Sequence, residues 1–159
     1  MIVLPQRLEL LQRMPIFGAI SADALEFLLQ RAATVRLAAG EHFFHEGDGA
    51  TGMFVLEAGH VLIARAAAGR TIVLGELGPG DCFGEMALMD MHPRSASARA
   101  VDECQAIEIR PDALYELFKH DCVQFALIQM NMGREVCRRL RATDDLLFAV
   151  SAGPSDRLA

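Results

Sequence analysis

The stretch FGEMALMDMHPRSASARA, residues 83–100, sets a glutamate, Glu85, and an arginine, Arg94, among glycine, alanine and serine residues. Small residues leave backbone N–H groups uncovered and let a ligand approach the main chain. A carboxylate accepts hydrogen bonds from hydroxyl groups, and a guanidinium holds a phosphate with two parallel N–H bonds. A ribose phosphate satisfies both side chains. The alternative is an internal Glu85–Arg94 salt bridge with no ligand.

Around this stretch, residues 34–110 consist of short apolar runs separated by glycine turns. The runs are TVRLA, HFFHE, MFVLEA, VLIARA, TIVLGEL, ASARAV and CQAIEI. Many short strands with near-regular turn signals indicate a β-sandwich or barrel rather than a parallel α/β sheet. The segment GEMALMD, residues 84–90, is the exception, because it is made of good helix formers.

Helices are expected on both sides of this β zone. Residues 6–33 contain an apolar stripe at helical spacing, with Ser21 placed to cap a helix. Residues 111–148 begin with Pro111, which suits a first helical position. Residues 1–150 are therefore predicted to form one domain, and residues 151–159 a flexible tail.

Composition limits the classes of function. The chain has 159 residues, a formal net charge of -6 and four cysteines without a C-x-x-C pair. An acidic chain lacks the basic surface that non-specific nucleic-acid binding needs, and scattered cysteines favour free thiols in a reducing compartment. No apolar run has the length of a signal peptide or a membrane span. We expect a cytoplasmic protein that contacts neither nucleic acid nor membrane.

Residues 83–100 resemble the phosphate-binding cassette of cyclic nucleotide-binding domains, whose pattern is roughly F-G-E-x-A-L, a spacer, then P-R-[AST]-A-[ST]. The flanking stretch AAGEHFFHEGDGATGMFVLEAGHVLI resembles the family's G-E-x-[IF]-[IF]-x-x-G-D-x-[AG]-x-x-M-[FY]-x-[IV] signature, and MPIFGAISADALEFL its helical entry. The resemblance covers about residues 8–148. It implies a mainly β fold with flanking helices, namely a jelly-roll-like β-roll (double-stranded β-helix) with a short phosphate-binding helix and a long C-terminal helix.

The resemblance also implies roles for single residues. Glu85 would accept a hydrogen bond from the ribose 2′-OH, and Arg94 would pair with the exocyclic phosphate oxygens of a 3′,5′-cyclic nucleotide. The rest of the expected pocket consists of small or neighbouring residues: Gly84, Met86, Ala87, Ser95 and Ala96.

The base end of the pocket is expected on the C-terminal helix. The segment MGREVCRRLRATDDLLF resembles the long dimer helix of bacterial cyclic-AMP receptor transcription factors. In that comparison Thr143 occupies the position of a threonine that contacts the adenine amino group. Asp144 replaces a serine, and a carboxylate accepts from either adenine or guanine, while Ser95 can favour guanine. Cyclic AMP is the expected ligand and cyclic GMP the alternative; plain helix surface is the other interpretation of Thr143 and Asp144.

Other chemistries have little support in the sequence. His42 and His45 suggest a metal site, but the H-x-H spacing of a metal-binding cupin is absent and a strand would place the two side chains on opposite faces. No Ser-His-Asp pattern of recognisable spacing and no Walker motif is present. We therefore expect no metal, no cofactor and no enzymatic activity.

The combined expectation is a stand-alone, bacterial, cyclic nucleotide-binding regulatory domain that acts in signal transduction by moving its C-terminal helix. A β-roll interaction module that no longer binds nucleotide is one alternative, and a fragment of a longer regulator is another. A stripe at nearly coiled-coil spacing indicates a homodimer through the C-terminal helix, with packing on the β-roll as the alternative. The residues of the stripe are Ala126, Met130, Gly133, Cys137 and Leu140. The downstream protein partner is not specified by the sequence.

Overall fold

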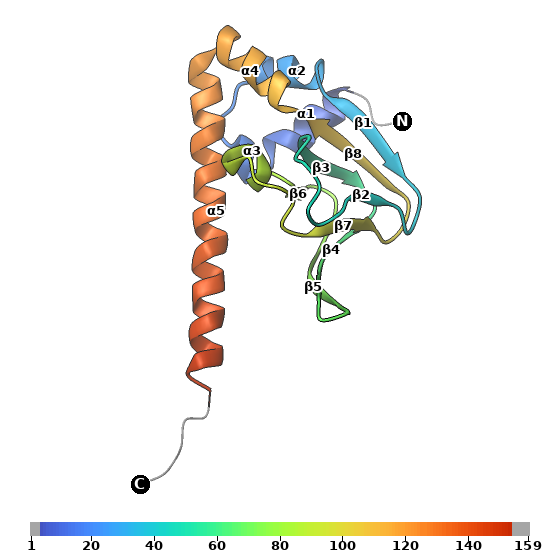
Figure 1. Cartoon of the computed structure of the whole chain (residues 1–159). Helices are drawn as coiled ribbons and strands as arrows, with labels where there is room; N and C mark the ends of the chain where they lie inside the picture. Colours follow the sequence, from blue (N-terminus) through green and yellow to red (C-terminus); the bar gives the residue numbers. More distant parts are fainter. Residues whose placement is uncertain (1–3, 154–159) are drawn as a thin grey trace.

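The computed structural model describes residues 4–153 and shows a β-roll with helices at one end and one long helix along its side (Figure 1). Before the roll come α1 (Leu4–Gln12), the 3-10 turn η1 (Pro15–Phe17) and α2 (Ala22–Leu29). After it come α4 (Pro111–His120) and α5 (Cys122–Ser151). The short helix α3 (Met86–Asp90) interrupts the strands, as the helix-forming segment 84–90 predicts.

Within residues 4–153 the strands form two four-stranded antiparallel sheets, ordered β1-β8-β3-β6 and β2-β7-β4-β5. Each predicted apolar run matches one strand, to within about two residues at either end. The strands are β1 (Ala33–Leu37), β2 (His42–Phe44), β3 (Met53–Ala58), β4 (Val61–Ala67), β5 (Arg70–Leu77), β6 (Cys82–Phe83), β7 (Ser97–Ala100) and β8 (Cys104–Ile109). Only β6 was not predicted, because two residues carry no periodic signal. The mainly β fold class with flanking helices is confirmed.

Strand β3 separates two hydrophobic cores, because alternate side chains on a strand point to opposite faces. Met53 and Val55 pack in the core that the helices share with the outer face of the roll. Phe54 and Leu56 point into the roll, where they meet Phe83 and small residues of β7 and β8. Burial on both faces explains why MFVLEA is a continuous apolar run rather than an alternating one.

The flanking helices begin where their sequences predict. The Ser21 hydroxyl accepts a hydrogen bond from the backbone N–H of Ala24 and caps α2. Pro111 is the first residue of α4, and Asp121 caps α5 by accepting from the N–H of Gln124. Asn131 anchors α5 to the N-terminal segment by donating to the carbonyl of Gly18 at 2.8 Å.

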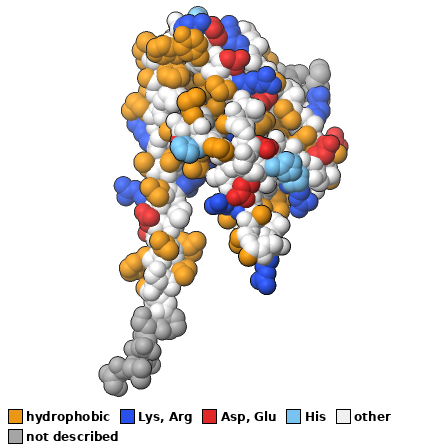
Figure 2. All heavy atoms as spheres, viewed as in Figure 1, with side chains coloured by type: hydrophobic (Ala, Val, Ile, Leu, Met, Phe, Trp, Pro, Cys, Tyr) orange, Lys and Arg blue, Asp and Glu red, His pale blue; other side chains and the backbone are white. Residues whose placement is uncertain are grey.

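Helix α5 runs past the roll, and its last turns extend beyond the rest of the molecule (Figure 1). Figure 2 shows hydrophobic side chains along this part of the helix. Leu146, Leu147 and Phe148 are each more than 60% exposed. Four members of the predicted stripe are also exposed, so the stripe does not pack on the roll: Ala126, Met130, Cys137 and Leu140. No helix in the described part of the chain is both long and apolar enough to cross a bilayer.

Helix α5 continues to Ser151, so it includes the first residue of the predicted tail, and residues 154–159 of that tail lie outside the described part. Cys82 and Cys104 are buried, whereas Cys122 and Cys137 are exposed, and all four are free thiols.

Candidate functional site

A cavity of about 690 Å³ lies between the β-roll, the segment around α3 and the middle of α5. Phe44, Ile63 and Leu77 contribute apolar walls from the sheet that contains β2, β4 and β5. Charged side chains come from two directions, because the roll supplies Arg94 and α5 supplies Arg139. The cavity has room for a nucleotide-sized ligand, within the 300–1,000 Å³ typical of ligand pockets.

Arg94 is 4% exposed and lies in the cavity wall. Its guanidinium donates to the carbonyls of Gly84, at 2.9 Å, and Gly52, at 2.6 Å. It also lies over the ring of Phe44, with 4.1 Å between the guanidinium carbon and the ring centroid. Burial lowers the pKa of Arg94 from its usual value, while the carboxylates of Glu108, Asp48 and Glu85 oppose this shift. A guanidinium nevertheless stays charged at neutral pH.

The backbone around Arg94 is fixed by the turn that connects β2 and β3. The N–H of Arg94 donates to the carbonyl of Asp48, and the N–H of Gly47 donates to the carbonyl of Arg94, both at 2.8 Å. Because the main chain is held on both sides, the side chain leaves it in a defined direction toward the cavity. The Nε atom of Arg94 is buried and has no partner among the described residues.

Gly84 is required by this arrangement for two reasons. Its φ of +79° is in the region that side chains rarely adopt. A Cβ atom at this position would lie 2.7 Å from Nη1 of Arg94. Gly84 therefore lets the main chain approach the guanidinium closely enough for its carbonyl to accept the hydrogen bond.

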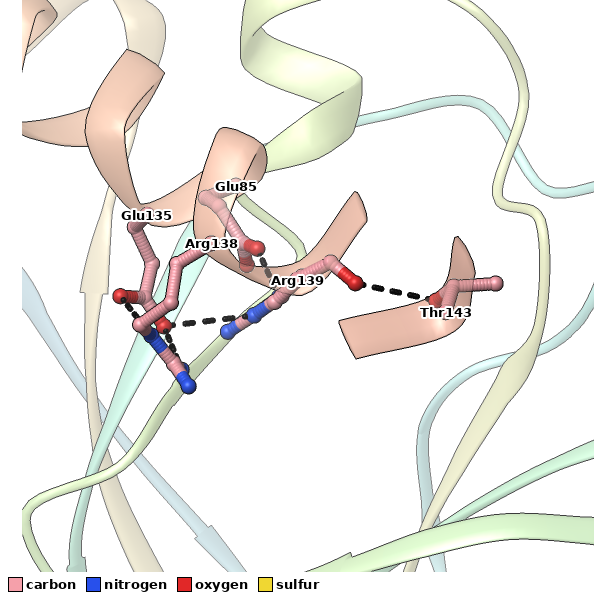
Figure 3. A network of polar contacts seen from close by, with 5 residues as sticks. All are labelled: Glu85, Glu135, Arg138, Arg139 and Thr143. Carbon is pink, nitrogen blue, oxygen red and sulfur yellow. Dashed lines mark hydrogen bonds and ion pairs between the residues drawn. The ribbon is translucent and has the colours of Figure 1, made fainter. Parts of the chain in front are cut away.

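Glu85 precedes α3 and is 1% exposed. Its Oε1 atom forms an ion pair with Nη1 of Arg139 on α5 (Figure 3). Its Oε2 atom is buried and has no hydrogen-bond partner in the part of the chain that the structure describes. A buried carboxylate oxygen without a donor is unfavourable, so its position in a cavity wall indicates a place for an external donor.

Glu135 and Arg138, two more charged residues of α5, belong to the network in Figure 3. Glu135 accepts two hydrogen bonds from Arg138, at 2.6 and 3.0 Å, and lies 3.4 Å from Nε of Arg139. Arg138 is the main cause of a lowered pKa at Glu135, with a smaller contribution from Arg139. Arg139 thus lies between two carboxylates, one on its own helix and one beside α3.

Sequence reasoning missed Glu135, Arg138 and Arg139 as cavity residues. Their spacing of three and four residues is the signal of ion pairs on one helix face. The spacing does not reveal that this face meets the pocket, since that depends on how α5 packs.

The predicted site residues fall into two groups. Those in the first group line the cavity: Gly84, Glu85, Met86, Arg94, Ser95 and Ala96. Ala87 lies next to them in α3. Thr143 and Asp144 do not line the cavity and are exposed on α5. The Thr143 hydroxyl donates to the carbonyl of Arg139 within the helix, at 3.0 Å, which places it one turn beyond the cavity.

Glu85 and Arg94 do not form the internal salt bridge considered as an alternative, because each has other partners.

The expectation that His42 and His45 lie on opposite faces of a strand is wrong. Strand β2 ends at Phe44, and the two imidazole rings stack with centroids 4.2 Å apart. Among the described residues, no group of three His, Cys, Asp or Glu side chains has the geometry of a metal site.

Comparison with known families agrees with this fold. The cyclic nucleotide-binding domain family matches residues 34–121. The chain belongs to the cyclic nucleotide-binding domain family.

Individual relatives include regulators and a kinase. A CRP-like cAMP-activated global transcriptional regulator of Mycobacterium tuberculosis is 32% identical over 145 residues, which cover 88% of this chain and 63% of the regulator. A cGMP-dependent protein kinase of Toxoplasma gondii is 35% identical over 91 residues, 57% of this chain and 9% of the kinase. The crystal structure of Thermus thermophilus catabolite activator protein superposes with a TM-score of 0.77 at 28% identity, covering 86% of this chain and 63% of that chain. The chain spans less than two thirds of the length of these relatives.

Proposed function

We propose that the chain is a sensor that binds a 3′,5′-cyclic nucleotide between Glu85 and Arg94. The observation that carries the proposal is the pair of unsatisfied atoms in one cavity. Oε2 of Glu85 and Nε of Arg94 are both buried and lack partners within residues 4–153. A ribose hydroxyl supplies the donor that Glu85 lacks, and a phosphate supplies acceptors for Arg94.

The phosphate end of the proposed site is built for close approach. Arg94 has five N–H donors, and the carbonyls of Gly52 and Gly84 accept hydrogen bonds from two of them. Ser95 and Ala96 line the cavity beside it and cover little of the main chain. The sugar end is Glu85, with Gly84, Met86 and Ala87 as its neighbours.

Cyclic AMP is the proposed ligand. A cAMP-activated regulator and a cGMP-dependent kinase are both among the relatives, so the family includes proteins named for either nucleotide. Cyclic GMP is therefore the alternative; Ser95 favours it, and the Asp144 carboxylate accepts from either base. Thr143 and Asp144 remain the contacts to the base that the family resemblance suggests. From their place one turn beyond the cavity, they reach the base only if the base extends along α5.

Signalling would pass through the Glu85 carboxylate. Arg139 occupies one of its oxygens and the ribose hydroxyl would occupy the other, so the ligand and α5 share one group. A ligand shifts a helix between two positions only if it binds one position more tightly than the other. The shared carboxylate supplies such a difference, because a ligand seated on Glu85 changes how strongly it holds Arg139.

We infer five broader properties with this function. The domain acts alone in a bacterial cytoplasm, regulates a downstream protein, has no catalytic activity and uses no metal or cofactor. It forms a homodimer through the exposed stripe of α5, whose spacing from Met130 to Leu140 suits helix–helix contact.

One observation favours a different function, an interaction module without a ligand. Glu85 is already paired with Arg139, and Arg94 is already bonded to two carbonyls, so the charges are largely satisfied within the chain. A thermal-shift screen with cyclic AMP, cyclic GMP and 5′-AMP separates the two functions, since a ligand that binds the native state raises the melting temperature. A shift with a cyclic nucleotide and none with 5′-AMP supports the sensor. No shift with either cyclic nucleotide supports the module.

A further inference from the structure

Glu108 is a buried carboxylate that the proposed function does not use. It lies on β8 opposite Phe54 of β3 and is 6% exposed. Residues directly opposite each other on paired strands point to the same face of a sheet, so Glu108 shares the face of Phe54, which packs inside the roll. Its neighbours Ile107 and Ile109 pack in the other core, on the opposite face. A charged side chain inside the roll needs a partner there, because an unpaired buried charge is costly.

The structure places Glu108 beside the carbonyl that holds Arg94. A Cβ atom added to Gly52 would lie 3.3 Å from Cγ of Glu108, so this side chain packs close to the glycine. The carbonyl of Gly52 accepts a hydrogen bond from Nη2 of Arg94 at 2.6 Å. The guanidinium carbon also lies 6.0 Å from the ring centroid of Phe54, the residue opposite Glu108. The buried carboxylate and the buried guanidinium therefore lie close to the same two residues.

Glu108 is the carboxylate best placed to balance the charge of Arg94. Burial lowers the pKa of Arg94, and Glu108 has the largest effect among the three carboxylates that oppose this shift. Of the other two, Asp48 is exposed, so water and salt screen its charge. Glu85 is paired with Arg139.

We propose that Glu108 is a positioning residue that neutralises Arg94 before the nucleotide binds and therefore competes with the phosphate for it. Arg110 limits this competition, because its Nη2 and Nε atoms donate to Oε2 of Glu108 at 3.1 and 3.3 Å. When a phosphate takes Arg94, Glu108 keeps Arg110 and is not left as an unpaired buried charge. This inference rests on the proposed function, because it needs a phosphate at Arg94.

Isothermal titration of cyclic AMP and cyclic GMP into the whole chain tests this inference. Glu108→Gln keeps the shape of the side chain and removes its charge. Both nucleotides should then bind about threefold to tenfold more tightly, by the same factor, because they share the phosphate. The variant should also be less stable without nucleotide, since Arg94 loses its counter-charge. Loss of a residue with only a structural role would not tighten binding.

Arg110→Gln should have the opposite effect. Glu108 would then have Arg94 as its remaining counter-charge, so the affinity for both nucleotides should fall about twofold to threefold. Should Glu108→Gln fail to fold, Arg110→Gln carries the test alone, and an unchanged or higher affinity in that variant would overturn the inference.

The matched control is Glu57→Gln. Glu57 is also a buried carboxylate paired with an arginine, but its partner is Arg7 of α1, and it is not among the carboxylates that act on Arg94. Glu57→Gln should therefore lower stability and leave both affinities unchanged.

The inference is wrong if a folded Glu108→Gln variant binds as the wild type does or more weakly. It is also wrong if Glu57→Gln tightens binding as much as Glu108→Gln. In both cases Arg94-dependent binding would persist and the proposed function would stand. If the wild type binds neither nucleotide, the proposed function fails and this inference fails with it.

Discussion

Arg139 on α5 forms an ion pair with Glu85, the buried residue that precedes α3. This contact links the longest helix of the protein to the carboxylate that we propose as the sugar contact. A change in the hydrogen bonding of the Glu85 carboxylate therefore acts directly on α5 through this ion pair.

The first prediction concerns the ion pair itself. Arg139→Ala should lower the free energy of unfolding by about 1–3 kcal/mol, because the buried Glu85 carboxylate loses its charged donor. Arg139→Lys should retain most of that stability, since an ammonium group can still reach one oxygen. Urea denaturation of the three proteins measures the difference. Equal stability of Arg139→Ala and the wild type would show that the pair contributes nothing.

The second prediction concerns Gly84. Gly84→Ala should destabilise the protein by about 1–3 kcal/mol, because φ is +79° and the new methyl group meets Arg94 Nη1 at 2.7 Å. It should also weaken nucleotide binding, since the guanidinium must move. Gly49→Ala is the control, because Gly49 has no positive φ and its added Cβ meets nothing within 4 Å. We expect Gly49→Ala to raise stability by about 0.4–1 kcal/mol. A neutral Gly84→Ala would argue against a tight fit at Arg94.

The third prediction concerns a buried clamp between α1 and β3. Arg7 donates to Glu57 from Nη2 at 2.8 Å, and Nε lies 2.7 Å from the other oxygen; the Glu57 side chain is fully buried. Glu57→Ala should lower the free energy of unfolding by about 3–5 kcal/mol. The Arg7 guanidinium would then have no counter-charge and little contact with solvent. The exposed pair of Glu9 on α1 and Arg13 directly after it offers the control, and Glu9→Ala should change stability by less than about 0.5 kcal/mol. If chemical denaturation showed that both variants lose similar unfolding free energy, the Arg7–Glu57 pair would not have the predicted stabilising role.

The fourth prediction concerns pH. Hydrogen bonding and charge attraction from Asp102 raise the pKa of His60 above 6.5, and the hydrogen bond from His60 lowers the pKa of Asp102 below 3.8. The raised pKa of His60 means that its contribution is complete below pH 6.5 and is lost as pH rises through the folded-state value. For Asp102 the contribution is present above pH 3.8 and is lost as pH falls through its lowered pKa. The pair should therefore stabilise the fold most between these two limits.

An NMR titration of the His60 ring signals measures this directly. In Asp102→Asn the pKa of His60 should fall toward its usual value. An unchanged His60 titration in Asp102→Asn would rule out the proposed cause of the shift.

Much of the fold could be predicted from the sequence, because strands and glycine turns alternate at regular spacing and helix caps such as Ser21 are local signals. The cavity residues within 84–96 follow from one continuous motif. The placement of Arg139 could not be predicted, because it depends on how α5 crosses the roll. Thr143 was predicted as a base contact from resemblance alone, and its distance along the helix from the cavity became visible only with tertiary structure. The stacking of His42 on His45 was missed because β2 ends earlier than its apolar run.

The direct test of the sensor proposal is calorimetric titration of cyclic AMP and cyclic GMP into the wild type and Arg94→Ala. We expect the wild type to bind one nucleotide per chain, and the variant to bind about 100-fold more weakly or not at all, because two charge-assisted hydrogen bonds to the phosphate are lost. Circular dichroism should show that the variant remains folded. Equal affinity of a folded Arg94→Ala variant and the wild type would show that the phosphate is not held at Arg94.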